Sequence, residues 1–196
     1  MSESPDRWFR VLHVCTGNIC RSPMAERIML AELIARFGPD AGHIEVTGAG
    51  TYGGHAGAPM HAPAAQVLGE MGVDAADFTA TWLREPAVQR ADLVLTATAD
   101  HRSQVLGLDQ RALRRTFALK ELARLADQVG VEQLPPGGPA MRLSALAVLA
   151  SGLRGIYPAH PRSVDDISDP YGGPIEEFRQ TAQQIRAAVR SILRPL

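Results

Sequence analysis

Segments with the apolar pattern of a strand alternate along this chain with segments whose apolar residues have helical spacing. This alternation predicts the order of its strands and helices. Short, mostly apolar runs predict strands at residues 9–14, 44–47, 92–96 and 115–119. The third run is apolar through its middle, which is typical of a strand buried on both faces of a parallel sheet. Apolar residues at helical spacing predict helices at residues 23–37, 60–71, 99–107, 140–153 and 175–192. Strands and helices in alternation indicate an α/β fold with a parallel sheet and right-handed crossovers.

The first and last predicted helices are the best defined. Ser22 is a good N-cap for the first and Pro23 a good first helical residue, while Gly38-Pro39 ends it. Its expected apolar stripe comprises Ile28, Leu30, Leu33, Ile34 and Phe37. The last helix shows the most regular spacing of apolar residues: Ile175, Phe178, Ala182, Ile185, Val189 and Ile192.

Composition limits the classes of protein to consider. The chain has 196 residues, 45% hydrophobic and 21% charged, as expected for one globular domain with a sizeable core. Its net charge of −1 gives no overall field for nucleic acid or an anionic membrane. The N-terminus lacks an apolar signal core, and the apolar stretch at 141–153 is too short to span a membrane. With only two cysteines, both in residues 15–22, we expect no disulfide framework and a cytoplasmic location.

The segment between the first strand and the first helix, residues 15–22, has the features of an oxyanion-binding loop. It reads Cys-Thr-Gly-Asn-Ile-Cys-Arg-Ser. Backbone N–H groups in such a loop can form an anion nest, and the helix that follows directs the positive end of its dipole to the same point. This field favours thiolate over thiol, and the thiolate is the nucleophilic form of cysteine. The alternative is a buried cysteine beside a helix cap.

Each residue of the loop suits phosphoryl transfer. Cys15 is placed to attack phosphorus, and Arg21 can clamp two equatorial oxygens with its planar fork. Gly17 allows close backbone approach, and Ser22 can donate a hydrogen bond to the leaving thiolate. We expect the remaining loop residues to bind phosphate as well: Thr16, Asn18, Ile19 and Cys20. The six scattered histidines form no ligand cluster, so we expect neither a metal nor another cofactor.

Residues 15–23 match the pattern Cys-x-Gly-Asn-x-Cys-Arg-Ser-Pro throughout, and here the chain resembles the low-molecular-weight protein tyrosine phosphatases. Asp169-Pro170-Tyr171 resembles a second element of that family, near its C-terminus. The resemblance covers about residues 9–125 and 164–193. It implies a three-layer α/β fold, with a four-stranded parallel twisted sheet, helices on both faces and the phosphate-binding loop after the first strand.

The resemblance also bears on domain organisation. We expect a single phosphatase domain over 1–196, in which residues 126–163 are an insertion without a family motif. This segment contains Leu134-Pro135-Pro136-Gly137-Gly138-Pro139 and, after the short helix, another irregular stretch. Long excursions inside a domain are usually functional flaps or mobile segments. We favour a packing or mobile role over a catalytic one.

By its place in the resemblance, Asp169 is the general acid. A phenol has a pKa of about 10, so phenoxide leaves poorly at neutral pH unless it is protonated. The alternative is an Asp-Pro turn before a helix. Asp165 and Asp166 lie near in sequence but lack the Pro-aromatic context. Tyr171 is expected to form a pocket wall and stack on an aromatic substrate, or else to pack against the last helix.

Several positions depart from the family pattern or leave a choice open. Gly48 stands where a supporting serine is expected, and residues 78–81 read Phe-Thr-Ala-Thr instead of His-x-Ala-Arg. Tyr52 is the candidate for a second pocket aromatic, and the histidines of the same Gly-rich loop, His55 and His61, are further candidates for its lining. Cys20 is either a redox guard that pairs with Cys15 under oxidant or a small apolar filler.

The favoured function is hydrolysis of phosphotyrosine in proteins through a phosphocysteine intermediate. The first alternative is a protein arginine phosphatase, a subgroup that has threonine where this chain has Ile19. The others are a non-catalytic phosphate-binding module and an arsenate reductase, which would need an external thiol because no cysteine follows residue 20. The expected partners are phosphorylated proteins, with weak self-association, and neither nucleic acid nor membrane.

Overall fold

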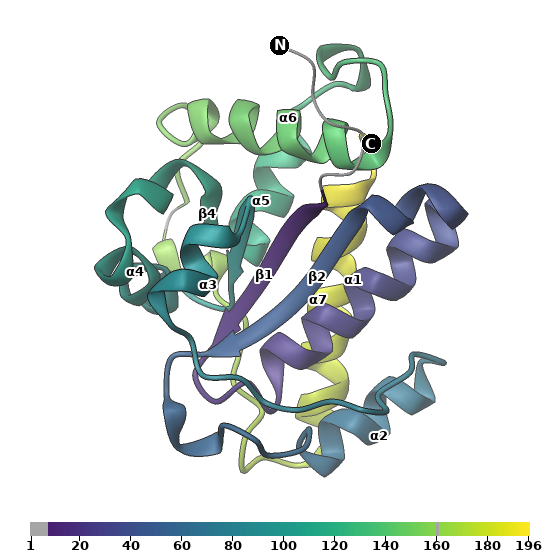
Figure 1. Ribbon diagram of the computed structural model, residues 1–196, viewed down its shortest axis with the longest axis vertical. Helices are drawn as coiled ribbons and strands as arrows, with labels where there is room; N and C mark the ends of the chain where they lie inside the picture. Colours follow the sequence, from purple (N-terminus) through teal and green to yellow (C-terminus); the bar gives the residue numbers. More distant parts are fainter. Residues whose placement is uncertain (1–7, 160) are drawn as a thin grey trace.

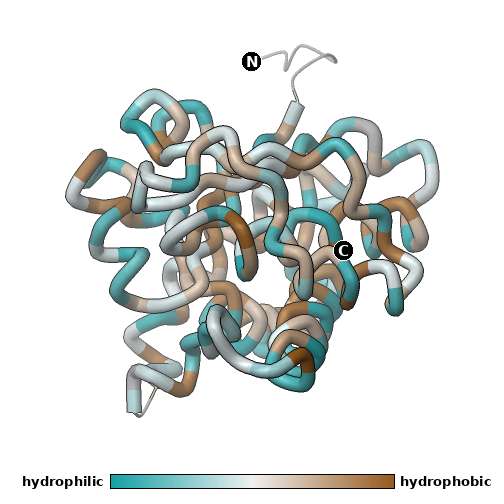
Figure 2. The backbone as a smooth tube through the Cα atoms, turned by 90° about the horizontal axis from the view of Figure 1, so that it is seen from below, coloured by the Kyte–Doolittle hydropathy of each residue, from teal (hydrophilic) through white to brown (hydrophobic). Residues whose placement is uncertain are grey.

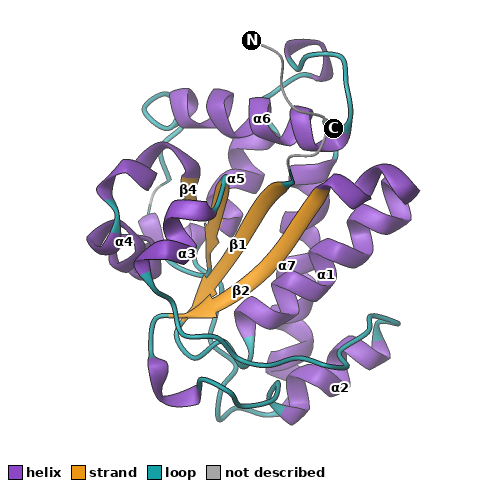
Figure 3. Ribbon diagram, in the orientation of Figure 1, coloured by secondary structure: helices purple, strands orange, loops and turns teal. Residues whose placement is uncertain are grey.

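A four-stranded parallel sheet forms the centre of the molecule, as the alternating pattern predicts (Figure 3). The computed structural model describes residues 8–159 and 161–196. The strand order is β2-β1-β3-β4, so the first strand lies in the interior of the sheet. The strands are β1 (Phe9–Cys15), β2 (Ile44–Gly50), β3 (Leu93–Thr96) and β4 (Thr116–Ala118).

Helices cover both faces of the sheet and complete the three predicted layers (Figure 1). On one face lie α1 (Arg21–Phe37), α5 (Leu119–Ala126) and α7 (Ile175–Leu193), with α2 (Ala62–Glu70) packed on α7. On the other face lie α3 (Glu85–Arg90) and α4 (Ala99–Leu108). Short 3-10 helices join these elements: η1 (Gly38–His43), η2 (Gly53–His55), η3 (Gln110–Arg115), η4 (Val131–Gln133) and η5 (Arg162–Asp165).

Side chains of β1 alternate between the two cores, as the pleat of a strand requires. Val11 belongs to the core under α1 and α7, whereas Leu12 and Val14 belong to the core under α3 and α4. In Figure 2 apolar and polar stretches alternate along the tube, as expected for helices that turn one face to a sheet. Burying both faces explains why strands such as β3 are apolar at successive positions.

The predicted stripe of α7 is confirmed, and that of α1 is partly wrong. Five of the six predicted positions in α7 are buried: Phe178, Ala182, Ile185, Val189 and Ile192. In α1, Ile28 and Leu33 are buried but Ile34 is 55% exposed, while Met24 and Met29 occupy core positions. Ile34 follows Leu33 by one residue, so the helix turns it about 100° away from the buried face.

The predicted start of the first helix is also wrong. Helix α1 begins at Arg21 with Cys20 as N-cap, and Cys20 makes no side-chain capping hydrogen bond. Ser22 lies inside the first turn, where its hydroxyl contacts Cys15 and Asn18 instead of capping the helix. Ser22, although its type favours capping, thus stabilises the loop instead of the start of the helix.

The helical part of the predicted insertion, residues 131–153, packs at the end of the sheet away from Cys15. Its main helix, α6 (Pro139–Leu153), contacts α5 together with η1 and η3, which directly precede β2 and β4. It therefore lies across the amino ends of the strands, at the top of Figure 1. Its buried apolar residues include Leu143, Leu146, Ala147 and Ala150. Within the described ranges, no helix combines the length and apolar character needed to cross a membrane.

Candidate active site

The loop after β1 lies where the strand order changes direction. β1 ends at Cys15 and α1 begins at Arg21. The loop between them starts at the carboxyl end of β1, the strand that lies between β2 and β3 in the sheet. In open α/β sheets, ligands bind outside the carboxyl ends of the strands at such a switch point. The position of the loop therefore agrees with the expectation of a phosphate-binding loop after the first strand.

The backbone of the loop is held by the segment that follows β2. Three of its carbonyl oxygens accept N–H groups from that segment: Cys15 from Thr51 (2.9 Å), Thr16 from Tyr52 (2.8 Å) and Ile19 from His61 (2.9 Å). In a trans peptide the carbonyl and the next N–H point in opposite directions. The N–H groups of Thr16, Gly17 and Cys20 therefore point to the other side of the loop, as an anion nest requires.

A chain of hydrogen bonds supports the Cys15 thiol from below. The Ser22 hydroxyl lies 3.0 Å from Cys15 Sγ, and it accepts a hydrogen bond of 2.8 Å from Asn18 Nδ2. Because Asn18 is the donor in that bond, the Ser22 proton is free to be donated to the sulfur. Asn18 is fully buried at φ +53°, and its Oδ1 accepts the Thr81 N–H at 2.8 Å. A short polar residue tolerates this left-handed conformation better than most.

The glycine at position 48 makes room for this support. A Cβ atom there would lie 2.7 Å from Asn18 Nδ2 and 2.8 Å from Glu26 Oε2, which is too close for either atom to stay in place. The amide and the carboxyl group thus occupy the space of the expected serine. Burial raises the pKa of Glu26 to about 7, against the opposing effect of the neighbouring Arg27.

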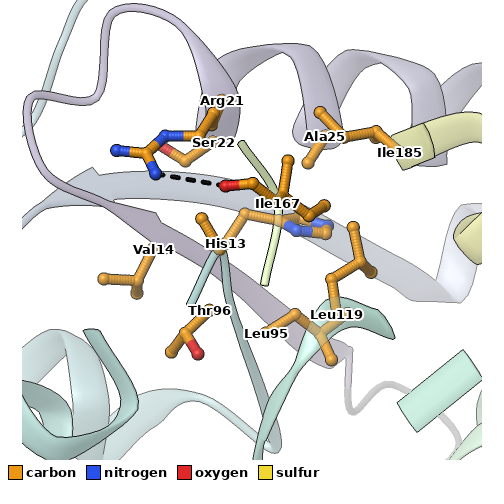
Figure 4. A pocket seen from close by; sticks show the side chains of 11 residues that line it. His13, Val14, Arg21, Ser22, Ala25, Leu95, Thr96, Leu119, Ile167 and Ile185 are labelled. Atoms are coloured by element: carbon orange, nitrogen blue, oxygen red, sulfur yellow. Dashed lines mark hydrogen bonds between the residues drawn. The ribbon is translucent and has the colours of Figure 1, made fainter. Parts of the chain in front are cut away.

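Arg21 is almost buried and is held at both ends of its fork. Its Nη1 donates to the Ile167 carbonyl at 3.3 Å, and Figure 4 shows this bond between two residues that line a small cavity of about 10 Å³. Its Nη2 donates to Asp169 Oδ2 at 2.6 Å and to Thr16 Oγ1 at 3.2 Å. The side chain is 7% exposed, whereas that of Asp169 is 47% exposed. A charge buried to this degree needs such partners.

The structure separates the three candidate acids. Asp165 is buried in an ion pair with Arg124, whose Nη2 lies 2.8 Å from its Oδ2. Asp166 accepts the Ala99 N–H at the start of α4, at 2.8 Å. Only Asp169 among the three lines the cavity that contains Cys15.

This cavity, the Cys15 cavity, has a volume of about 190 Å³. It is lined by Cys15, Thr16, Gly17, Ile19, Cys20, Arg21, His55, Asp169 and Tyr171. Asn18 and Ser22, both expected among the phosphate-binding residues, are absent from this lining and support the loop from within the core. The cavity thus joins a thiol, a guanidinium and a carboxylate from two distant parts of the sequence.

The family model for the low molecular weight phosphotyrosine protein phosphatases matches residues 10–134. The chain belongs to this family. It is 32% identical over 188 residues to a low molecular weight protein-tyrosine-phosphatase of Streptomyces coelicolor, covering 94% of this chain and 92% of the other. It is 27% identical over 181 residues to a protein-arginine-phosphatase of Geobacillus stearothermophilus, covering 92% and 91%. The structure of the T. tengcongensis low molecular weight protein tyrosine phosphatase aligns with a TM-score of 0.66 at 29% identity, covering 95% and 99%.

The rim of the phosphatase cavity is aromatic, but its composition differs from the expectation. Tyr171 is 58% exposed and lies 6.5 Å from the His55 ring and 5.2 Å from the His61 ring. Tyr52, the expected second pocket aromatic, is not among the lining residues; it packs edge-on against His55, 5.6 Å away. His61 stacks on Phe178 of α7 behind Tyr171. His55, and not Tyr52, therefore lines the cavity beside Tyr171.

Cys20 lines the cavity of this phosphatase as a buried thiol. Burial raises the pKa of Cys20 to about 12, and the nearby Cys15 acts in the same direction. The group is therefore a neutral thiol at neutral pH. Both cysteines are free, and the choice between redox guard and filler stays a prediction for experiment.

Sequence reasoning missed His101, which bonds to the loop from α4. Its Nε2 lies 2.9 Å from Thr16 Oγ1. A signal for it exists, because His101 lies in the first turn after β3, the neighbour of β1 at the switch point. The partial burial of Glu26 beside Gly48 had no comparable signal, since a glutamate early in a helix is usually exposed.

Proposed function

We propose that this phosphatase hydrolyses phosphotyrosine in proteins through a phosphocysteine intermediate. The observation that carries the proposal is the meeting of Cys15, Arg21 and Asp169 in one cavity. Binding of phosphate alone would need neither a thiol nor an acid. Their presence together therefore supports catalysis over a phosphate-binding module.

In the first step, the Cys15 thiolate attacks phosphorus and the bond to the phenolic oxygen breaks. Arg21 and the loop N–H groups hold the phosphoryl oxygens, which positions the group and stabilises its charge. Asp169, as a carboxylic acid, donates its proton to the leaving oxygen. The phosphate displaces the Asp169 carboxyl group from Arg21 Nη2. Asp169 is then free to contact the leaving oxygen.

In the second step, water attacks the phosphocysteine and the bond between phosphorus and sulfur breaks. Asp169, now a carboxylate, accepts the proton of the water. The Ser22 hydroxyl donates a hydrogen bond to the thiolate as it leaves, in the arrangement that its 3.0 Å contact with Cys15 Sγ supports. Dividing one displacement into two lowers the barrier of each.

Two features favour phosphotyrosine over phosphoarginine. Ile19 presents an apolar side chain to the cavity, and Tyr171 offers an exposed ring for stacking on a phenol. The arginine phosphatase of Geobacillus is similar along most of this chain, so phosphoarginine is the second candidate substrate. A catalytic thiol needs a reducing environment, which supports the cytoplasmic location. Phosphorylated proteins as partners and weak self-association stay predictions.

The test compares phosphotyrosine and phosphoarginine peptides of one sequence side by side, with Cys15→Ser as the blank. We expect kcat/KM to favour phosphotyrosine at least tenfold, and Ile19→Thr to reduce that preference. A preference for phosphoarginine would overturn the substrate assignment but keep the mechanism. No Cys15-dependent turnover of either peptide would overturn both.

A further inference from the structure

His101 connects helix α4 to the phosphate-binding loop through two hydroxyl groups. It is 5% exposed in the first turn of α4. Its Nε2 lies 2.9 Å from Thr16 Oγ1, and its Nδ1 lies 2.7 Å from Thr98 Oγ1. Thr98 is the N-cap of α4 and also accepts the backbone N–H of His101. The imidazole is thus fixed at both nitrogens.

Thr16 passes this contact on to Arg21. Arg21 Nη2 lies 3.2 Å from the same Thr16 oxygen, and a guanidinium can only donate, so the oxygen accepts and its own proton is free for His101. Burial lowers the pKa of His101 to about 4, with the charge of Arg21 as the second cause, so the ring is neutral at pH 7. The positive charge of Arg21 favours the tautomer whose Nε2 lone pair faces Thr16.

We propose that His101 is a positioning residue that fixes the orientation of the Arg21 guanidinium through the Thr16 hydroxyl. This rests on the proposed function, in which Arg21 clamps the phosphate. When phosphate displaces Asp169, the bonds from Arg21 to Ile167 and to Thr16 remain. These two acceptors hold the fork in place, so less rotamer freedom is lost when the anion binds.

The competing explanation is that His101 only secures α4. Two amide variants separate the explanations because they differ by one methylene. The amide of His101→Gln reaches the place of Nε2, beside Thr16, whereas that of His101→Asn reaches only the place of Nδ1, beside Thr98. Positioning requires the first contact, and securing α4 requires the second.

The measurement is the Kd of inorganic phosphate, together with kcat, KM and melting temperature for each variant. We expect His101→Asn to weaken phosphate binding about three- to tenfold, as for one lost hydrogen bond, and His101→Gln to stay within about twofold of the wild type. In a double-mutant cycle, His101→Asn should add less than about twofold to the effect of Thr16→Val. The proposal would be overturned if the two amide variants weakened phosphate binding equally. It would also be overturned if the fold-changes of His101→Asn and Thr16→Val multiplied in the double mutant, as they do for independent sites.

Two provisions keep the result decisive. If His101→Asn does not fold, Thr16→Val against Thr16→Ser tests the same contact from the loop, and the serine should retain phosphate binding. Because phosphate binding needs no turnover, the expected pattern in an enzyme inactive on phosphotyrosine would overturn only the proposed function. Full activity without the pattern would overturn only the positioning role.

Discussion

The floor and the wall of the Cys15 cavity are built in opposite ways. The floor, residues 15–22, is one continuous segment in which Cys15 is 2% exposed and hydrogen bonds link successive side chains. The wall comprises His55, from the segment after β2, and Asp169 and Tyr171, both from the loop before α7. Tyr171 is 58% exposed, and its ring lies near the rings of His55 and His61. Under the proposed mechanism the floor binds the phosphoryl group, which every substrate has, and the wall contacts the leaving group, which differs between substrates.

This difference has an energetic basis. Buried polar groups such as Asn18 and Arg21 are costly unless their hydrogen bonds are satisfied, so the floor tolerates one arrangement. Exposed loop residues with few contacts can move at low cost. Changes to the catalytic and hydrogen-bonded polar groups of the floor should therefore affect all substrates alike. Changes in the wall, or at Ile19, whose apolar side chain lines the cavity, should depend on the substrate.

The largest effect is expected in the floor. Cys15→Ser should abolish turnover of every ester, by roughly 10⁴-fold or more as for loss of a covalent nucleophile, and should retain phosphate binding. Arg21→Lys should lose both, because lysine cannot supply the bidentate fork. Steady-state kinetics and phosphate binding measure the two effects. Substantial hydrolysis by Cys15→Ser would exclude the phosphocysteine mechanism.

In the wall, Asp169→Asn should give a loss that depends on the leaving group. Phenyl phosphate releases a basic phenoxide, so kcat/KM should fall by roughly 10²–10⁴-fold, the range of general acid catalysis. A nitrophenyl phosphate releases a weaker base and should be affected less. The measurement is kcat/KM across a series of aryl phosphates.

The two neighbouring aspartates supply matched controls. Asp166→Asn keeps an oxygen that can accept the Ala99 N–H, so it should leave both the series and the stability nearly unchanged. Asp165→Asn breaks the buried pair with Arg124 and should lower the melting temperature without a dependence on the leaving group. A uniform loss over all esters for Asp169→Asn, or a graded loss in either control, would show that the acid is wrongly assigned.

Much of the fold could be predicted because its signals are local. All four strands and helix α7 follow from apolar periodicity, which depends only on neighbouring positions. Helices α3 and α5 were not predicted, since their six and eight residues are shorter than the windows in which a helical period can be recognised. Ile34 was misplaced because a stripe drawn from apolar residues alone cannot tell which edge of a helix meets the sheet.

For the site, too, residues with a local sequence signal could be predicted, and residues that depend on tertiary packing could not. The floor could be predicted from sequence because Cys15 and Arg21 belong to one contiguous loop. In the wall, Asp169 and Tyr171 could also be predicted, because they share one short Asp-Pro-aromatic motif. The role of His55 could not, because the choice between Tyr52 and His55 depends on how the loop after β2 folds over Gly17, whose added Cβ would lie 2.9 Å from the His55 ring. His101 meets Thr16 only through the pairing of β1 with β3. Such contacts depend on tertiary packing.

The smallest effect concerns the support beneath the floor. The pKa of Glu26 is raised to about 7 in the folded chain from 4.5, chiefly by burial. A carboxyl group whose pKa is raised on folding contributes stability that is fully present below the unfolded value and is lost as pH rises through the folded value. Between about pH 5 and pH 8 the folded chain therefore loses stability at this position, because the buried group becomes charged.

Glu26→Gln keeps the shape of the side chain and removes its charge. We expect the variant to match the wild type near pH 5 and to be more stable near pH 8, by on the order of 1–3 kcal/mol or several degrees in melting temperature. Thermal unfolding of both proteins at the two pH values measures the difference. Glu132→Gln, at an exposed glutamate, is the control, and any change that it makes to the melting temperature should be equal at pH 5 and pH 8. A Glu26→Gln variant that is less stable at pH 8 than the wild type would mean that the carboxylate is stabilised where it lies, and that the support beneath the floor contains a charge in place of a neutral acid.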